Sequence, residues 1–178
     1  MYQLRELSRK DIPEINKWRN DRAIIHCLGA PYRYINQEVD ERWYDNYMAN
    51  RNNSVRCAIV SENDDNIIGL ISLVGIDFLN QSAELHIMIG NSDNQGKGAG
   101  TYAVKQMLSH AFHNMNLHRI QIKVLDDNKR AIHLYEKVGF VCEGISRESR
   151  FKEGKFVNMV NYSILREEFE KNIHNQNS

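Results

Sequence analysis

The segment from Asn94 to Thr101 constrains the fold of this chain most, because it holds three glycines within five positions. It follows an alternating apolar stretch typical of a strand and opens a segment with helical periodicity. Glycine inside a helix costs about 1 kcal/mol relative to alanine, so helix propensity does not explain Gly96, Gly98 and Gly100. Glycines at a strand-to-helix turn let the backbone approach a ligand and direct N–H groups at phosphate oxygens. The segment therefore predicts a phosphate-binding loop, and a glycine turn without a ligand is the alternative.

Two common nucleotide-binding motifs do not fit the spacing of these glycines. A Walker A loop has four residues between its first glycine and Gly-Lys, whereas five residues separate Gly90 from Gly96, and Gly98 occupies the hydroxyl position. The dinucleotide pattern G-x-G-x-x-G fails as well, because the glycines fall at 96, 98 and 100. Lys plus Arg and Asp plus Glu both total 23, so no overall cationic field favours nucleic acid. A nucleotide- or nucleic-acid-binding domain is therefore the disfavoured alternative.

Hydrophobic periodicity predicts alternating strands and helices along the chain. Strands are expected at 2–7, 55–60, 67–74, 83–89, 120–124, 140–147 and 156–164, with turn residues at 63–66. Helices are expected around Ile12, Ile15 and Trp18, and over 37–48, 98–115 and 128–138. This order predicts an α+β fold with a central mixed, mostly antiparallel sheet of about seven strands, flanked by about four helices.

Length and composition are those of one ordinary globular domain: 178 residues, 42% hydrophobic and 26% charged. We expect a single domain over 1–169 and a frayed tail over 170–178. No apolar run approaches the roughly 20 residues of a membrane span, and the N-terminus lacks the apolar core of a signal peptide. Three widely spaced cysteines form neither a disulfide framework nor a zinc site. A cytoplasmic protein without membrane, nucleic-acid or metal partners is the expectation, and a homo-oligomer stays open.

Two segments resemble motifs of the GCN5-related N-acetyltransferase (GNAT) superfamily. Residues 95–100, Gln-Gly-Lys-Gly-Ala-Gly, match its Gln/Arg-x-x-Gly-x-Gly/Ala loop, and 128–140 is similar to its Asn-x-x-Ala-x-x-Leu-Tyr-x-x-x-Gly-Phe segment. The resemblance is closest to the branch with spermidine, ribosomal-protein and amino-sugar N-acetyltransferases. It implies the GNAT fold and transfer of an acetyl group from acetyl-CoA to an amine.

The same resemblance implies which residues hold the co-substrate. N–H groups of the glycine loop would bind the CoA pyrophosphate, and the backbone of the strand at 87–89 would pair with the pantetheine arm like an added strand. Asn128 would contact the cofactor as well. The expected cofactor-binding residues are Ile87, Met88, Ile89, Gln95, Gly96, Lys97, Gly98, Ala99, Gly100 and Asn128.

Amine acetylation requires two proton movements, and two residues are expected to carry them. An alkylamine with a pKa near 10.4 is almost fully protonated at pH 7, and freeing its lone pair costs roughly 4–5 kcal/mol. Glu84 is the candidate base, with His86 on the same strand face and an ordered water chain as alternatives, and a solvated carboxylate without a role is equally consistent. Tyr135 is the candidate proton donor to the departing thiolate, because it lies seven residues after Asn128 and so on nearly the same helix face.

The expected acceptor is the primary amine of a small molecule, a polyamine or an amino sugar. Direct attack in a ternary complex is favoured, because Cys57 and Cys142 lie in no motif that suggests a covalent nucleophile. A protein N-terminal acetyltransferase and a non-catalytic acyl-CoA-binding module are the alternatives. The stretch 26–37 holds no carboxylate and carries Arg33, which departs from the acidic pattern of the spermidine enzymes. Five aromatic residues could stack on a sugar or belong to the core: Tyr32, Tyr34, Trp43, Tyr44 and Tyr47.

Overall fold

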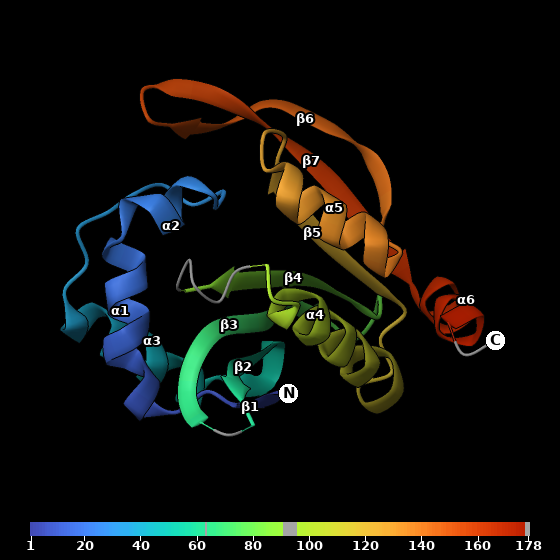
Figure 1. The fold of residues 1–178 in the computed structure, drawn as a ribbon, viewed down its shortest axis with the longest axis horizontal. Coiled ribbons are helices and arrows are strands. Elements are labelled where there is room, and N and C mark those ends of the chain that lie inside the picture. The colour runs from blue at the N-terminus through green and yellow to red at the C-terminus, as the bar shows by residue number, and fades with distance from the viewer. Residues whose placement is uncertain (63, 91–95, 177–178) are drawn as a thin grey trace.

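The computed structural model describes residues 1–62, 64–90 and 96–176, and its centre is one seven-stranded sheet (Figure 1). The spatial order is β1-β2-β3-β4-β5-β7-β6, and every neighbouring pair is antiparallel except the parallel pair β4 and β5. The expected mixed, mostly antiparallel sheet is confirmed. Its strands are β1 (Tyr2–Glu6), β2 (Ser54–Ser61), β3 (Asp64–Asp77), β4 (Ser82–Ile89), β5 (Arg119–Leu125), β6 (Val141–Lys152) and β7 (Lys155–Leu165).

Six α-helices are found in the described part of the chain, two more than expected. They are α1 (Ile12–Asn20), α2 (Arg22–His26), α3 (Gln37–Ala49), α4 (Ala99–Ser109), α5 (Lys129–Val138) and α6 (Arg166–Gln176). The short helix α2 spans too few residues for periodicity to show, and it starts where the Asp21 carboxylate accepts hydrogen bonds from the N–H groups of Ala23 and Ile24. None of the described helices is both long enough and apolar enough to cross a membrane.

Helix α6 corrects the expectation of a frayed tail, because it continues to Gln176. Two contacts hold its first half against the domain. The Phe169 ring is buried and packs on Phe112, with 5.5 Å between ring centroids. The Arg166 guanidinium donates to the carbonyl of Leu117 at 2.7 Å and to Oδ1 of Asn116 at 3.0 Å. These long-range contacts stabilise a helix that its polar sequence alone does not predict.

Two hydrophobic clusters cover opposite faces of the sheet, because side chains alternate along each strand. Ile59, Ile71 and Leu85 face a cluster completed by α4 and α5, whereas Ala58 and Val60 face one completed by α1 and α3. Several element boundaries differ from expectation: β6 continues to Lys152 instead of ending at 147, and β3 continues to Asp77 instead of ending at 74. Strand β3 already begins at Asp64, so residues 64–66 extend the strand instead of forming the turn. The long helix expected over 98–115 ends as α-helix at Ser109 and continues as a π-helical turn over 110–114.

Strands β4 and β5 separate shortly after they pair, and this shapes the site. Their parallel ladder joins Ser82, Ala83 and Glu84 of β4 to Arg119, Ile120 and Gln121 of β5. Beyond Glu84, β4 remains paired with β3 as far as Ile89, while β5 remains paired with β7 as far as Leu125. Figure 1 shows the two strands diverging, with α4 and α5 beside the opening.

Candidate active site

A cavity of about 970 Å³ occupies the region where β4 and β5 diverge. One end is lined by the glycine loop, the start of α4 and the side of α5. The other end is lined by the segment 24–31 around the end of α2 and by side chains from β2, β3 and β4. This volume suits a ligand much larger than a single amine.

The glycine loop needs glycine for two different reasons. Gly96 and Gly98 have φ values of +78° and +91°, a left-handed conformation that side-chain-bearing residues rarely adopt. A Cβ at Gly98 would meet no atom within 4 Å, so the backbone conformation and not crowding requires this glycine. At Gly100 a Cβ would lie 3.0 Å from Cδ1 of Leu134, so this glycine permits close packing of α4 on α5. Gly98 immediately precedes α4, which directs the first N–H groups of that helix toward the loop.

The remaining loop residues expected to bind the cofactor divide into three cases. Gln95 lies outside the described residues. Lys97 is exposed, and its carbonyl accepts a hydrogen bond from the Tyr2 hydroxyl at 3.1 Å. Ala99, the first residue of α4, is buried in the core.

The end of β4 also lines the cavity, through Ile87, Met88 and Ile89. They pair with β3 on one side, and no strand of the described chain pairs with them on the other, so their backbone fits an extended ligand arm.

Asn128 lines the cavity, but its side chain is engaged within the protein. Its Oδ1 accepts from the N–H of Ala131 at 3.1 Å and caps α5, while its Nδ2 donates to the carbonyl of Cys27 at 2.9 Å. Asn128 therefore ties the start of α5 to the segment after α2. A direct cofactor contact by this side chain stays a prediction.

Tyr135 lies on α5 with only 5% of its surface exposed, and it lines the cavity. Its ring packs edge-on against Phe140, with the centroids 5.7 Å apart. Within the part of the chain that the structure describes, no group hydrogen-bonds its hydroxyl. Burial raises the pKa of Tyr135 above its ordinary value of 10. The phenol is therefore protonated at every physiological pH and available as a hydrogen-bond donor in the cavity.

Glu84 sits at the point where β4 and β5 part, between two basic side chains. Its Oε1 lies 3.0 Å from Nε2 of His86, and its Oε2 lies 3.3 Å from Nζ of Lys123. The hydrogen bond from His86, together with the charge of Lys123, lowers the pKa of Glu84 to about 2, against the opposing effect of partial burial. Glu84, His86 and Lys123 all line the cavity. The structure thus brings both expected catalytic side chains, Tyr135 and Glu84, to one cavity.

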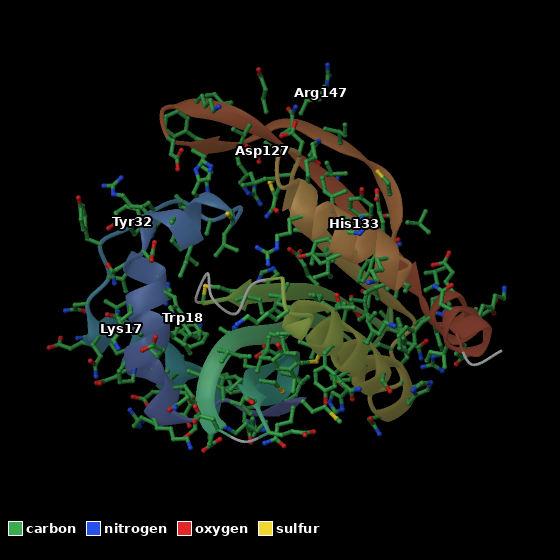
Figure 2. The ribbon with its side chains drawn as sticks, viewed as in Figure 1. Lys17, Trp18, Tyr32, Asp127, His133 and Arg147 are labelled. Atoms are coloured by element: carbon green, nitrogen blue, oxygen red, sulfur yellow. The ribbon has the colours of Figure 1, made fainter. Side chains whose placement is uncertain are left out.

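Three residues carry no signal in the sequence that links them to the site: Arg56 lines the cavity, whereas Lys152 and Gly90 act on elements beside it. Arg56 of β2 lines the cavity although its sequence neighbours form an ordinary strand. Lys152 at the end of β6 is buried, and its Nζ donates to the carbonyls of Ile25 (2.6 Å), Leu28 and Ala30 (3.4 Å). Gly90 leaves no room for a side chain, because a Cβ there would lie 1.8 Å from Cε2 of Trp18. Figure 2 marks that tryptophan on α1 and His133 on α5, which both belong to elements beside the cavity.

The candidate sugar-stacking aromatics do not gather at the cavity. Trp43, Tyr44 and Tyr47 of α3 pack on the cluster between α1, α3 and the sheet. Tyr32 and Tyr34 contact each other edge-on, with the centroids 5.3 Å apart. None of the five lines the cavity, as far as the described residues show. Trp43, Tyr44 and Tyr47 serve packing, whereas Tyr34 is 85% exposed. An aromatic platform for a sugar therefore finds no support at this cavity. No group of three or more metal-ligating side chains occurs among the described residues.

Comparison with known proteins agrees with this geometry. A family model described as an acetyltransferase (GNAT) domain matches residues 2–141. The spermidine N(1)-acetyltransferase of Vibrio cholerae is 32% identical over 167 residues, which covers 93% of this chain and 94% of that protein. A putative ribosomal N-acetyltransferase of Bacillus subtilis is 32% identical over 107 residues, covering 60% of this chain and 58% of that one.

A solved structure shows the same arrangement of elements. The crystal structure of the Vibrio cholerae spermidine N-acetyltransferase in complex with CoA and spermine superposes with a TM-score of 0.88 at 31% identity, covering 95% of this chain and 98% of that one. The fold, the glycine loop and the match over most of the sequence lead to one conclusion: this chain belongs to the GNAT family and is an N-acetyltransferase.

Proposed function

We propose that the protein transfers the acetyl group of acetyl-CoA to the primary amine of a small molecule, by direct attack within a ternary complex. One observation carries the proposal: the glycine loop, the unpaired edge of β4, Tyr135 and Glu84 all line a single cavity. Acetyl-CoA supplies the reactive thioester when bound. Because the relatives named above include spermidine enzymes, one solved with spermine, polyamines are the first acceptors to test.

The cofactor end of the cavity fits CoA on two grounds. Left-handed glycines before α4 leave backbone N–H groups free of side-chain cover, as an anionic diphosphate requires. The edge of β4 over 87–89 offers backbone groups to an extended pantetheine arm. Residues 96–100 would hold the diphosphate, and Ile87, Met88 and Ile89 would hold the arm.

Tyr135 serves as the donor to the leaving sulfur. A thiol ordinarily titrates near 8.5, and burial raises the pKa of Tyr135 above 10. Complete proton transfer from this phenol to a thiolate is thus uphill. Tyr135 therefore acts by donating a strong hydrogen bond that stabilises negative charge on sulfur, and the proton moves late.

Glu84 acts on the amine side, through its neighbours. With a pKa of about 2, its carboxylate is about eight units less basic than an alkylamine of pKa 10.4, so taking the amine proton directly would cost about 11 kcal/mol. Glu84 instead orients the His86 imidazole through their 3.0 Å hydrogen bond. Imidazole is the side chain whose charge changes closest to neutral pH. The proton of the amine passes to His86 or to a water held by this pair.

A thiol-release assay tests the proposal. Purified protein and acetyl-CoA are combined with polyamines, amino sugars, amino acids and N-terminal peptides, and free CoA is measured. Turnover with a small-molecule amine supports the proposal. Turnover with N-terminal peptides alone would identify a protein acetyltransferase. Binding of acetyl-CoA by calorimetry without turnover on any acceptor would identify a non-catalytic acyl-CoA-binding module.

A further inference from the structure

A row of polar side chains crosses the sheet on the face opposite α4. Strand register places Arg56 of β2 opposite Ser72 of β3, and Ser72 opposite His86 of β4. Glu84 lies two residues before His86 and therefore on the same face. All four side chains line the cavity. The proposed amine site at Glu84 and His86 is thus continuous with Arg56, two strands away.

Arg56 differs from the neighbouring basic residues because it has no carboxylate partner among the residues that the structure describes. Its guanidinium lies over the rings of Trp43 and Tyr47, 4.9 Å and 5.6 Å from their centroids. Its Nη1 reaches only the hydroxyl of Ser72, at 3.5 Å. Its Nε is buried and has no hydrogen-bond partner among the described residues. By contrast, Arg19 pairs with the buried Asp40 and Lys123 pairs with Glu84.

A partly buried guanidinium with an unpaired N–H is costly, because it has lost water without gaining a counter-charge. Desolvation also lowers the pKa of Arg56. Such a cost persists in a native protein most often where function requires it. The aromatic rings hold the planar guanidinium in place beside the cavity. Because Nε is buried, the two Nη groups are the ones that would bind a ligand, and a guanidinium is well suited to a carboxylate or phosphate.

The charge of the cavity lining agrees with an anionic ligand group at this end. Glu84 is the one acidic side chain that lines the cavity within the described residues, and it is already paired with His86 and Lys123. The basic side chains that line it are Arg19, Arg56, Lys123, Arg130, Lys137 and Arg150. Arg130 lies beside Gly96 at the cofactor end, while Arg19 and Lys123 are paired with Asp40 and Glu84. Arg56 is therefore the basic side chain beside the proposed amine site that has no carboxylate partner among the described residues, and an anionic group of the acceptor would be attracted to it.

We propose that Arg56 determines acceptor specificity by binding an anionic group, a carboxylate or a phosphate, that the acceptor carries in addition to its reacting amine. This inference rests on the proposed function and narrows its acceptor class. Neighbouring strands lie about 4.8 Å apart, so the backbones of Arg56 and His86 are about 10 Å apart. An amine and an anion separated by about five methylenes can span the two sites.

A matched panel of acceptors tests this inference. 6-Aminohexanoate, hexylamine and 1,5-diaminopentane each carry a primary amine on five methylenes and end in a carboxylate, a methyl group or an ammonium. A second comparison, of glucosamine 6-phosphate with glucosamine, tests a phosphate group in place of the carboxylate. We expect kcat/KM for the anionic member of each comparison to exceed the neutral one by about 10- to 100-fold, the usual worth of a charge-assisted hydrogen bond. The anionic group that gives the larger increase in kcat/KM over its neutral counterpart, carboxylate or phosphate, is the one that the site is built to bind.

The variant Arg56→Met tests whether Arg56 causes the preference for anionic acceptors. Methionine keeps an apolar stem against Trp43 and Tyr47 but removes the guanidinium, so the ratio of anionic to neutral acceptors should fall to near one while the KM for acetyl-CoA stays the same. Arg42→Gln is the control, since Arg42 is an exposed residue of α3 outside the cavity lining. Thermal unfolding checks the fold. We expect little change of Tm in Arg56→Met, because the loss of the cation–π contacts is offset by removal of the unpaired buried N–H.

Three results would overturn the inference. One is a wild-type preference for 1,5-diaminopentane that Arg56→Met leaves unchanged. Another is an equal rise in KM for every acceptor together with a lower Tm, which would assign Arg56 to packing. The third is an equal loss of preference in Arg42→Gln. Each of these leaves the proposed acetyl transfer standing, whereas absence of CoA release with every acceptor contradicts the proposed function itself.

Discussion

The two ends of the cavity are built in different ways. At the cofactor end, left-handed glycines lead directly into α4. Gly100 lets that helix pack on Leu134 of α5, which comes about 34 residues later in the sequence. At the acceptor end, Lys152 holds the carbonyls of Ile25 and Leu28, which are 127 and 124 residues away in sequence. One end depends on local backbone conformation, and the other depends on side chains that meet only after the chain has folded.

This difference has a functional consequence. A diphosphate can be bound by backbone N–H groups whose positions a short glycine segment already sets. An acceptor is distinguished by side chains, and here those come from β2, β3, β4, β6 and β7. Helix α5 connects the two ends, because it carries Tyr135 and its cap Asn128 donates to the carbonyl of Cys27. A substitution at one end should therefore change binding of the co-substrate or of the acceptor but not of both. A substitution on α5, which joins the two ends, should change the rate of acetyl transfer.

Tyr135→Phe tests the junction and should have the largest effect. Removing the hydroxyl leaves the buried ring and its contact with Phe140 in place, but it removes the hydrogen-bond donor. We expect kcat to fall by about 10²–10⁴-fold, the usual range for a general acid, with acetyl-CoA affinity retained. Steady-state kinetics and calorimetry measure the two quantities. Undiminished turnover would remove Tyr135 from the mechanism.

Glu84→Gln tests the amine side and should lower kcat at pH 7 by about 10- to 100-fold. Because its pKa is about 2, Glu84 stays ionised from pH 5 to 9 and adds no step of its own to the wild-type pH profile. The variant should regain rate toward pH 10, where the amine loses its proton unaided. Glu143→Gln is the control, since Glu143 pairs with Arg119 outside the cavity lining. If the ratio of variant to wild-type rates is constant with pH, Glu84 has no part in deprotonation.

Gly98→Val tests the cofactor end alone. We expect about a tenfold loss of acetyl-CoA affinity, since the left-handed backbone must change, and a folding cost of about 1–2 kcal/mol. Gly75→Val is matched to it, because Gly75 also has a positive φ, +59°, and open space around it, but it does not line the cavity. Gly75→Val should lose stability without losing affinity. Equal affinity losses in both variants would show that strain, not the loop, is responsible.

Gly100→Val separates packing from binding within the same loop. The added side chain meets Leu134, so this variant should lose about 1–3 kcal/mol of unfolding free energy by overpacking between α4 and α5. Denaturant unfolding measures that loss. We expect it to equal or exceed the loss in Gly98→Val, because the added side chain at 98 meets open space. A more stable Gly100→Val than Gly98→Val would contradict the close packing of these helices.

Lys152→Met tests the acceptor end and should have the smallest effect on rate. Three carbonyls of the segment 25–30 lose their common donor, so we expect a loss of about 1–3 kcal/mol in stability and a several-fold rise in the KM for the acceptor. The KM for acetyl-CoA should not change. Lys155→Met, on the exposed start of β7, provides the control. A rise in both KM values would mean that the two ends are not separable.

The elements whose residues repeat with a clear period were predictable from sequence. The seven strands follow alternating apolar residues, and α5 ends at Gly139 with φ of +109°, as a glycine stop implies. By contrast, α2 is too short for a period to show, and α6 is polar and held by Phe169 and Arg166. Their stability comes from contacts with residues distant in sequence, which no local pattern encodes.

The candidate site divides in the same way. Glycines in a strand-to-helix turn impose a backbone shape through their own φ preferences, and a tyrosine seven residues after a helix cap lies near that cap's face. The amino-acid sequence alone therefore determined the shape of the glycine loop and the position of Tyr135 relative to Asn128. Tertiary structure alone decided that Glu84 is held by His86 and Lys123, that Nε of Arg56 is buried without a partner among the described residues, and that Lys152 holds the segment after α2. Charge pairing and burial depend on distances in space, and the chain sets those only when its strands and helices pack together.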